Sequence, residues 1–254
     1  MPDHVVVGVQ DRILAVRLNR PEKKNALTFQ MYAGLAEALT KADGDPAVRV
    51  VLITGAPDCF TAGNDLADFA GAKPAQVSPA IRYLEALAAC SKPVVAAVAG
   101  VAIGIGTTLL LHCDLVYAAA SARFQLPFVN LGLCPEAASS VLLPALVGAH
   151  RAAELLLFGE PFGAEAARDL GIVNQVVADA DLLATATAMA QQLAQKPPRA
   201  LRTTKMLLKR GQAEVIKQAM SREGEQFAAL LEGPEAKEAM AAFLERRKPD
   251  FTRF

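Results

Sequence analysis

The chain has 254 residues, of which 53% are hydrophobic and 20% are charged, and its formal net charge is +0. This composition can fill the core of one large domain, and it excludes a strongly basic protein that binds duplex nucleic acid through its charge. No run of about 18 apolar residues predicts a membrane span. The first residues lack the basic start and apolar stretch of a signal peptide, so we expect a cytoplasmic protein with no nucleic-acid or membrane partner.

The first half of the chain alternates strand-like and helix-like patterns of apolar residues. Strands are predicted over residues 5–9, 12–18, 49–54, 94–99 and 114–118, the first two joined by a turn at Gln10-Asp11. Helices are predicted over 28–41, where Thr28 can cap the first turn, and over 79–91. Residues 19–25 and 58–73 are predicted loops, the second with a helical turn. Residues 104–113 begin with glycines and continue as an apolar run, which is typical of a strand that turns into a helix.

From Glu136 onward the chain is predicted to be mostly helical. The predicted helices cover 136–147, 150–157, 163–170, 179–195, 198–210, 213–231 and 234–247, and one short strand covers 173–177. Strands alternating with helices, followed by helices alone, indicate an α/β core with a helical C-terminal region. The Lys196-Pro197-Pro198 sequence is the predicted boundary, which divides the chain into 1–196 and 197–254.

The cysteines and histidines do not suggest a metal or thiol centre. No Cys-x-x-Cys pair and no metal-ligand spacing is present, so free thiols are expected at Cys59, Cys90, Cys113 and Cys134. Cys134 lies two residues before Glu136, but a nucleophilic cysteine needs a histidine partner, and none can be placed beside it. His112 lies in an apolar helical run and is predicted to be a buried core residue.

Glu136 stands out because it follows Pro135 within an otherwise apolar segment, residues 131–140. A carboxylate there is costly to desolvate unless it has a partner or a function. Upstream, residues 60–66 and 100–106 are turns rich in small residues, and both can present backbone N–H groups to a negative charge. One base and two donor segments are a minimal arrangement for moving a proton next to a carbonyl group.

Each of these features also has a structural explanation. Glu136 can be an acid at a helix N-terminus that the helix dipole stabilises. Gly100, Gly104 and Gly106 can serve close packing of a strand on a helix, and they lack the Gly-x-Gly-x-x-Gly spacing of dinucleotide-binding turns. The Gly63-Asn64-Asp65 sequence can be an ordinary turn.

Several segments, in order along nearly the whole chain, resemble the crotonase (enoyl-CoA hydratase/isomerase) superfamily. They are LNRPEKKNAL at 18–27, FTAGNDL at 60–66, KPVVAAVAG at 92–100, CD at 113–114 and FLERRK at 243–248. The resemblance implies an α/β fold, a spiral of ββα units with a helical C-terminal region that forms trimers, commonly stacked as hexamers. It also implies an acyl-CoA thioester substrate and no cofactor, because coenzyme A is part of the substrate.

The resemblance further implies which residues form the site. The backbone N–H groups of Ala62 and Ile105 would bind the thioester oxygen, and Arg246 of a neighbouring subunit would meet the coenzyme phosphates. The residues implied to contact the substrate or coenzyme A are Lys23, Lys24, Ala26, Leu27, Ala62, Gly63, Asn64, Asp65, Leu66, Gly104, Ile105, Phe128 and Arg246. Asp65 and Asp114 are expected to have mainly structural roles.

Hydratases of the superfamily use two glutamates to hold and activate water, and the matching positions here are Thr108 and Phe128. Neither side chain can act as a base near neutral pH, which argues against hydration. The LGLCPEAASS segment resembles the Δ3,Δ2-enoyl-CoA isomerase branch, which has Pro-Glu-Gly-Cys-Ser-Ser there, and Ala137 and Ala138 depart from its Gly-Cys. The expected activity is therefore a 1,3-proton transfer by Glu136, assisted by the two N–H donors.

Two alternatives stay open from the sequence. Hydration, thioester hydrolysis and decarboxylation of an acyl-CoA would use the same oxyanion site, and a second carboxylate or a histidine near the acyl carbons would favour them. A non-catalytic acyl-CoA-binding protein could have the same fold. The retention of Glu136 and of both turns argues against that second alternative.

Overall fold

The computed structural model describes residues 4–69 and 74–254. The larger of two sheets has the strand order β1-β2-β3-β5-β7-β10, in which β1 and β2 form an antiparallel hairpin and the later neighbours are parallel. Its strands are β1 (Val5–Gln10), β2 (Ile13–Leu18), β3 (Val50–Thr54), β5 (Val94–Val98), β7 (Leu115–Ala119) and β10 (Gln175–Val177). The central strands are continuous apolar runs because both faces of the sheet are covered.

The smaller sheet has the order β4-β6-β8-β9. Its strands are β4 (Cys59–Thr61), β6 (Val101–Ile103), β8 (Arg123–Gln125) and β9 (Phe162–Gly163). The chain passes from β3 to β4, from β5 to β6 and from β7 to β8, and each time it then enters helical residues. This repeated passage is the predicted spiral of ββα units, and it confirms the expected α/β fold.

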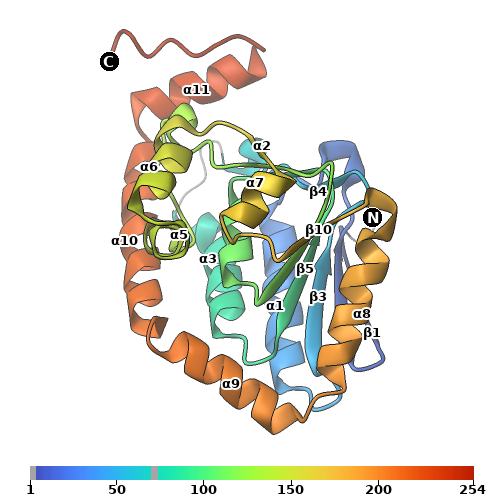
Figure 1. Cartoon of the computed structure of the whole chain (residues 1–254). Coiled ribbons are helices and arrows are strands. Elements are labelled where there is room, and N and C mark those ends of the chain that lie inside the picture. Colours follow the sequence, from blue (N-terminus) through green and yellow to red (C-terminus); the bar gives the residue numbers. More distant parts are fainter. Residues whose placement is uncertain (1–3, 70–73) are drawn as a thin grey trace.

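Helices cover both faces of the larger sheet (Figure 1). On one side, α1 (Phe29–Gly44) packs against α3 (Pro74–Ala89), and on the other α8 (Leu182–Ala194) contacts β3, β5 and β7. Successive side chains of β3 therefore point to opposite faces of the sheet. Val51 and Ile53 belong to the core on the side of α1 and α3, and Val50 and Leu52 belong to the core under α8.

Short helical segments connect the two sheets and lead into the C-terminal region. They are η1 (Pro21–Lys23), α2 (Leu66–Phe69), α4 (Ile105–Thr108), η2 (Leu109–His112), η3 (Val129–Leu131), α5 (Ser139–Val147), α6 (Ala149–Phe158), α7 (Ala164–Asp169) and η4 (Asp179–Asp181). In the part of the chain that the structure describes, no helix is long and apolar enough to cross a membrane.

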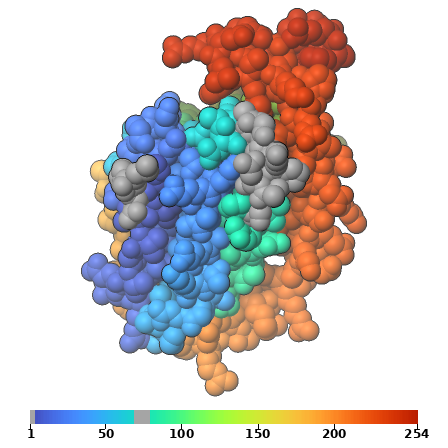
Figure 2. Space-filling view, turned by 180° about the vertical axis from the view of Figure 1, so that it is seen from behind, coloured from blue at the N-terminus to red at the C-terminus, as the bar shows by residue number. Residues whose placement is uncertain are grey.

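The last three helices, α9 (Pro198–Arg210), α10 (Ala213–Leu231) and α11 (Pro234–Leu244), form a band along one side of the core (Figures 1 and 2). Lys205 of α9 donates to the Asp114 carboxylate at 2.6 Å, and α10 packs against α5 and α3. Helix α11 meets η3, where Gly132 has φ +67 and a Cβ would lie 2.7 Å from the Ala236 nitrogen. Only glycine therefore permits this approach of the helix to the chain before Glu136.

The structure corrects several predicted boundaries. The first hairpin turns at Asp11 and Arg12, both with positive φ, because that geometry matches the twist of the flanking strands. The predicted helix 136–147 begins only at Ser139, since Ala137 and Ala138 are left-handed. Helix α3 begins at Pro74, earlier than the predicted 79, and β4, β6, β8 and β9 were missed because each has only two or three residues. Residues 70–73, the end of the predicted loop 58–73, lie outside the described residues.

Candidate functional site

Glu136 lies between η3 and α5, beside the first turns of the helical run that follows β6. Its Oε1 atom accepts a hydrogen bond of 2.6 Å from the hydroxyl of Thr108, a fully buried residue of α4. Thr107 is bonded elsewhere, since its hydroxyl donates to the carbonyl oxygen of Ala102 at 2.6 Å. The contact with Thr108 leaves the second carboxylate oxygen of Glu136 available for a substrate proton.

The turn after Glu136 is held in an unusual backbone conformation. Ala137 and Ala138 have φ angles of +59 and +57, although a left-handed conformation costs an L-residue about 1–2 kcal/mol. His112 donates from Nε2 to the carbonyl oxygen of Ala137 at 2.7 Å, because a carbonyl can only accept. Burial lowers the pKa of His112 to about 4, so this imidazole is neutral at pH 7. His112 is thus the predicted buried residue, and it supports the turn that carries Glu136.

Glu136 is poised to exchange a proton near neutral pH. Burial raises its pKa to about 7, the Thr108 hydroxyl acts in the opposite direction, and the negative charge of Glu223 adds to the rise. Burial also raises the pKa values of Tyr32 and Tyr83, and the charge of Glu136 adds to both rises. The two tyrosine rings lie 5.7 Å apart. A carboxylate in such apolar, aromatic surroundings is a stronger base than one in water.

The two predicted donor turns meet because of two glycines. A Cβ on Gly63, which has φ +93, would lie 2.8 Å from the carbonyl oxygen of Ile103. A Cβ on Gly106 would lie 2.7 Å from Cγ2 of Thr61. Residues 61–63 and 103–106 can approach this closely only because both positions lack a side chain. The glycines therefore bring the two turns together, which is also what the close-packing explanation expects.

The two predicted oxyanion donors differ in whether their N–H group already has a hydrogen-bond acceptor. The N–H of Ile105, in the first turn of α4, meets no hydrogen-bond acceptor among the residues that the structure covers. The N–H of Ala62 is engaged, because it donates to the carbonyl oxygen of Lys24 at 2.9 Å. For Ala62 to bind a thioester oxygen, this N–H has to exchange or share its acceptor.

Asn25 fastens the loop that carries Lys24, and sequence reasoning did not identify it as a site residue. It is fully buried, and its side-chain amide donates to the carbonyl oxygens of Cys59 at 2.9 Å and Phe60 at 3.1 Å. The backbone carbonyl oxygen of Asn25 accepts a hydrogen bond from the Thr61 hydroxyl at 2.7 Å. A buried amide with these partners couples residues 20–27 to the strand that precedes Ala62.

The structure brings several of the predicted coenzyme-binding residues together. Lys23 and Lys24 are exposed, Ala26 is partly buried, and Leu27 is buried and bridges to Asn64. Asn64 accepts the Tyr32 hydroxyl, whereas Asp65 accepts from Arg20 and from the N–H of Ala67, which is the structural role expected of it.

The other residues that were predicted to contact the substrate or coenzyme A lie in different elements. Leu66 begins α2, and Gly104 has φ +56 beside Ile105. Phe128 is buried, with 4% of its surface exposed. Arg246 is exposed on the turn after α11, and no ion pair in the described parts of the chain joins it to the other predicted residues. Within one chain the structure therefore does not test its proposed contact with coenzyme A.

The surroundings of the four thiols disfavour the thiolate form. All four cysteines are free, as predicted. Burial raises the pKa of Cys59 to about 11 and of Cys113 to about 12, and it also raises the pKa values of Cys90 and Cys134. Among the described residues, no group of three or more His, Cys, Asp or Glu side chains could hold a metal ion.

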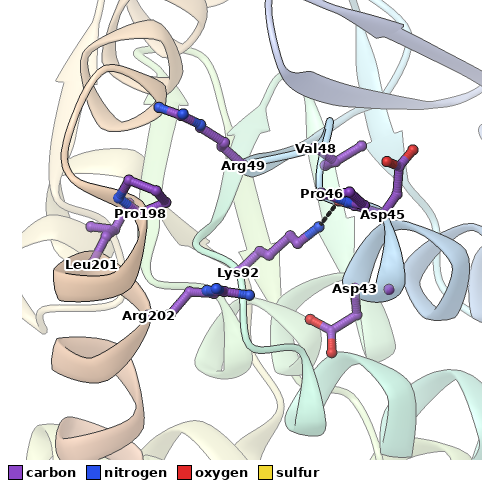
Figure 3. A pocket seen from close by; sticks show the side chains of 10 residues that line it. Asp43, Asp45, Pro46, Val48, Arg49, Lys92, Pro198, Leu201 and Arg202 are labelled. Carbon is purple, nitrogen blue, oxygen red and sulfur yellow. Dashed lines mark hydrogen bonds between the residues drawn. The ribbon is translucent and has the colours of Figure 1, made fainter.

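A cavity of about 240 Å³ lies at the opposite end of the larger sheet, where β3 and β5 begin (Figure 3). Its walls include Asp43, Arg49, Lys92 and Arg202, so it is charged. The Lys92 ammonium is already bound by the carbonyl oxygens of Ala42 and Asp45. Since Glu136 and the two turns lie beyond the carboxyl ends of these strands, this cavity is not part of the candidate site.

Known proteins resemble this chain over nearly its whole length. Residues 8–253 match the family model described as "Enoyl-CoA hydratase/isomerase". The chain is 35% identical to 1,2-epoxyphenylacetyl-CoA isomerase of Escherichia coli (strain K12), over 99% of each chain. It is 34% identical to 2,3-dehydroadipyl-CoA hydratase of the same strain, over 97% of this chain and 98% of that protein.

A solved structure is similar over the whole fold. The crystal structure of an enoyl-CoA hydratase/isomerase from Pseudoalteromonas atlantica T6c has a TM-score of 0.94 and 44% identity, and covers 98% of this chain and 100% of its own. The relatives include both an isomerase and a hydratase at nearly equal identity. Similarity alone therefore does not choose between the two reactions.

Proposed function

The chain belongs to the enoyl-CoA hydratase/isomerase (crotonase) family, and from that premise we propose that it is an isomerase that moves the double bond of a 3-enoyl-CoA to position 2. Enzymes of this family need no cofactor. The observation that carries the proposal is the Glu136 carboxylate, whose pKa burial raises to about 7 beside the two donor turns. One residue of this kind can take up a proton and return it.

The chemistry follows from the acidity of the substrate. The C2 protons of a 3-enoyl thioester are acidic because the dienolate that forms spreads its charge onto the thioester oxygen. Backbone N–H donors aimed at that oxygen are worth about 3 kcal/mol each in an enclosed site. Ile105 offers its N–H directly, and Ala62 joins it after releasing the Lys24 carbonyl. Glu136 removes a proton from C2 and the same carboxyl group returns a proton to C4.

The surroundings of Glu136 support proton transfer without water. Thr108 and Phe128 stand where the family resemblance places the two water-handling glutamates of hydratases. The Thr108 hydroxyl is committed to Glu136 at 2.6 Å, and Phe128 is a buried apolar side chain. Neither side chain provides an acid or base to activate a water molecule, which favours moving the double bond over adding water to it.

The direct test is turnover of trans-3-hexenoyl-CoA, followed by the ultraviolet absorbance of the conjugated 2-enoyl thioester. We expect catalytic formation of this product by the purified full-length chain. Absence of turnover with 3-enoyl thioesters of short, medium and long chain length would contradict the proposal.

We expect the turnover number to rise with pH through about 7 and to level off above it. Glu136 must be ionised to accept the C2 proton, and burial raises its pKa to about 7. Below this value the group is a neutral acid, so the rate falls about tenfold for each pH unit. A profile of kcat with trans-3-hexenoyl-CoA measures the midpoint. A midpoint near 4.5, the ordinary value for a glutamate, would contradict this role.

We expect little or no hydration of crotonyl-CoA, because Thr108 and Phe128 provide no acid or base for a water molecule. The measurement is the loss of conjugation absorbance together with chromatography of 3-hydroxybutyryl-CoA. A hydratase of known activity, run in parallel, shows that the assay detects the product. Efficient hydration that persists in Glu136→Gln would overturn the assignment of these two positions.

We also propose that the protein assembles as a homotrimer or a stacked homohexamer. The support is an unusual exposure of large apolar side chains on α6 and α11, where Leu157 is 64%, Phe158 67%, Phe243 62% and Leu244 76% exposed. Monomers rarely leave such groups in water. An assembly of this kind would let Arg246 of one subunit meet the coenzyme A phosphates held by another. Sedimentation at micromolar concentration tests the subunit number.

A further inference from the structure

Glu223 is a buried acid whose side chain is bound by backbone N–H groups. It lies in the middle of α10, with 7% of its surface exposed, and no ion pair found in the described parts of the chain includes it. One carboxylate oxygen accepts the N–H of Ala138 at 2.6 Å and the other accepts the N–H of Ser140 at 2.8 Å. Both of its oxygens are therefore used by the turn that follows Glu136.

These two bonds replace a cap that the local sequence does not supply. Helix α5 begins at Ser139, and Ala138 at the N-cap position has no side-chain acceptor for the first N–H groups. The carboxylate of Glu223 takes that place from a helix more than 80 residues later in the chain, where α10 packs against α5. It also meets the positive end of the α5 dipole, which favours its ionised form.

The same turn is held from its other side by His112, which donates to the Ala137 carbonyl oxygen at 2.7 Å. The strained residues Ala137 and Ala138 are thus each fixed at a backbone polar group, one by His112 and one by Glu223. Strained backbone persists only where the surrounding structure over-determines it. Because Glu136 immediately precedes this pair, its direction depends on the same two contacts.

We propose that Glu223 is a positioning residue for proton transfer: from α10 it holds the left-handed turn that aims the Glu136 carboxylate, without touching the substrate. This inference rests on the proposed role of Glu136 as the base. It assigns a part of the reaction to the C-terminal helical region of the same chain.

The electrostatic surroundings add a second effect of the same residue. Among the described residues, the titratable groups that interact electrostatically with Glu136 are Tyr32 of α1, Tyr83 of α3, Cys134 and Glu223 of α10. His112 of η2 contacts the next residue, Ala137. Burial raises the pKa values of the tyrosines and of Cys134, and it lowers that of His112, so these groups are neutral at pH 7. Burial raises the pKa of Glu223 as well, although its hydrogen bonds from Ser140 and Ala138 act in the opposite direction. In its ionised form, the charge of Glu223 opposes ionisation of Glu136.

The test compares Glu223→Gln with Glu238→Gln. The first substitution keeps the size of the side chain but removes the charge and one of the two acceptor oxygens. Glu238 is a matched control, because it is an equally buried acid of α11, 6% exposed, whose partners are Arg247, Arg253 and the N–H of Asp250. Each variant is titrated by 13C NMR with carboxyl-labelled glutamate, and the Glu136 signal is assigned by its loss in Glu136→Gln.

In Glu223→Gln we expect the midpoint of the Glu136 titration and of the kcat profile to fall together below those of the wild type. We expect kcat to fall by roughly 10–100-fold, with a smaller change in KM, because a misaimed base loses rate more than binding. Glu238→Gln is expected to keep the wild-type midpoint. Thr108→Val tests the direction of such shifts. It removes a hydrogen bond to the ionised form of Glu136, so the midpoint of the Glu136 titration should move upward.

A Glu223→Gln variant whose midpoint and kcat match those of Glu238→Gln would overturn the inference. A variant that loses kcat with an unmoved midpoint would also count against it, since that result describes only a structural residue. The NMR titration needs no substrate, so it separates this inference from the proposed function. If the wild type isomerises no 3-enoyl-CoA but its Glu136 midpoint still shifts in Glu223→Gln, the proposed reaction is wrong, and only the electrostatic effect of Glu223 on Glu136 is upheld, not its positioning role in that reaction.

Discussion

Glu136→Gln is expected to lower isomerase turnover by on the order of 10³-fold or more while acyl-CoA affinity stays within a few-fold of wild type. Glutamine keeps the shape of the side chain and can still accept the Thr108 hydroxyl, but it cannot take up the C2 proton. His112 does not replace it, because His112 is neutral and bound to the Ala137 carbonyl oxygen. Turnover of trans-3-hexenoyl-CoA and calorimetric binding of hexanoyl-CoA measure the two quantities.

The stability of this variant separates lost chemistry from lost folding. The pKa of Glu136 is raised by burial from 4.5 to about 7 in the folded chain, so its contribution to folding is most favourable below pH 4.5 and declines as pH rises through 7. Each pKa unit corresponds to about 1.4 kcal/mol. At pH 8 the wild type therefore carries an ionised buried carboxylate that Glu136→Gln lacks, and the variant should unfold at no lower temperature. Near-normal turnover by a folded variant would exclude Glu136 as the proton carrier.

Much of the fold could be predicted because its signals are local. The predicted strands contain the continuous apolar runs 50–53 and 94–99, and Thr28 caps α1 as expected, accepting the N–H of Met31 at 3.2 Å. The short strands of the smaller sheet could not be predicted in the same way. Strand β9 has only two residues, and its pairing with β8 depends on a partner almost 40 positions away.

The same distinction applies to the candidate site, in which some residues carry a local signal in the sequence and others do not. Glu136 could be recognised because an acid in an apolar segment contradicts its local surroundings. Glu223 could not, because a glutamate in the middle of an amphipathic helix is ordinary, and only the packing of α10 on α5 brings it to Ala138. The hydrogen bond from the Ala62 N–H to the Lys24 carbonyl oxygen also could not be predicted, because it depends on tertiary structure. Lys24 lies in a loop with left-handed residues, and buried Asn25 holds this loop in place.

These long-range contacts lead to the second large effect. A chain cut after Lys196 is expected to be insoluble or unfolded, and inactive, although 1–196 contains the predicted core. The cut removes Lys205, which binds Asp114, and it removes Glu223, which binds the turn after Glu136. It also uncovers apolar surface, because Phe227, Leu230 and Leu231 of α10 pack against the main core. Each unsatisfied buried group costs about 1–3 kcal/mol, against a typical total stability of about 5–15 kcal/mol.

Arg246→Ala in the full chain is the contrasting variant. It leaves the packing of α9, α10 and α11 intact, so the protein should stay folded and assembled and lose roughly tenfold in coenzyme A affinity, as for one exposed phosphate contact. Soluble yield, circular dichroism, sedimentation and coenzyme A binding compare the two proteins. A soluble 1–196 fragment with cooperative unfolding would show that the C-terminal region is a separate unit. Sedimentation of the full chain as an active, stable monomer would overturn the proposed assembly, whatever the effect of Arg246→Ala, because exposed Phe243 and Leu244 would then need no partner.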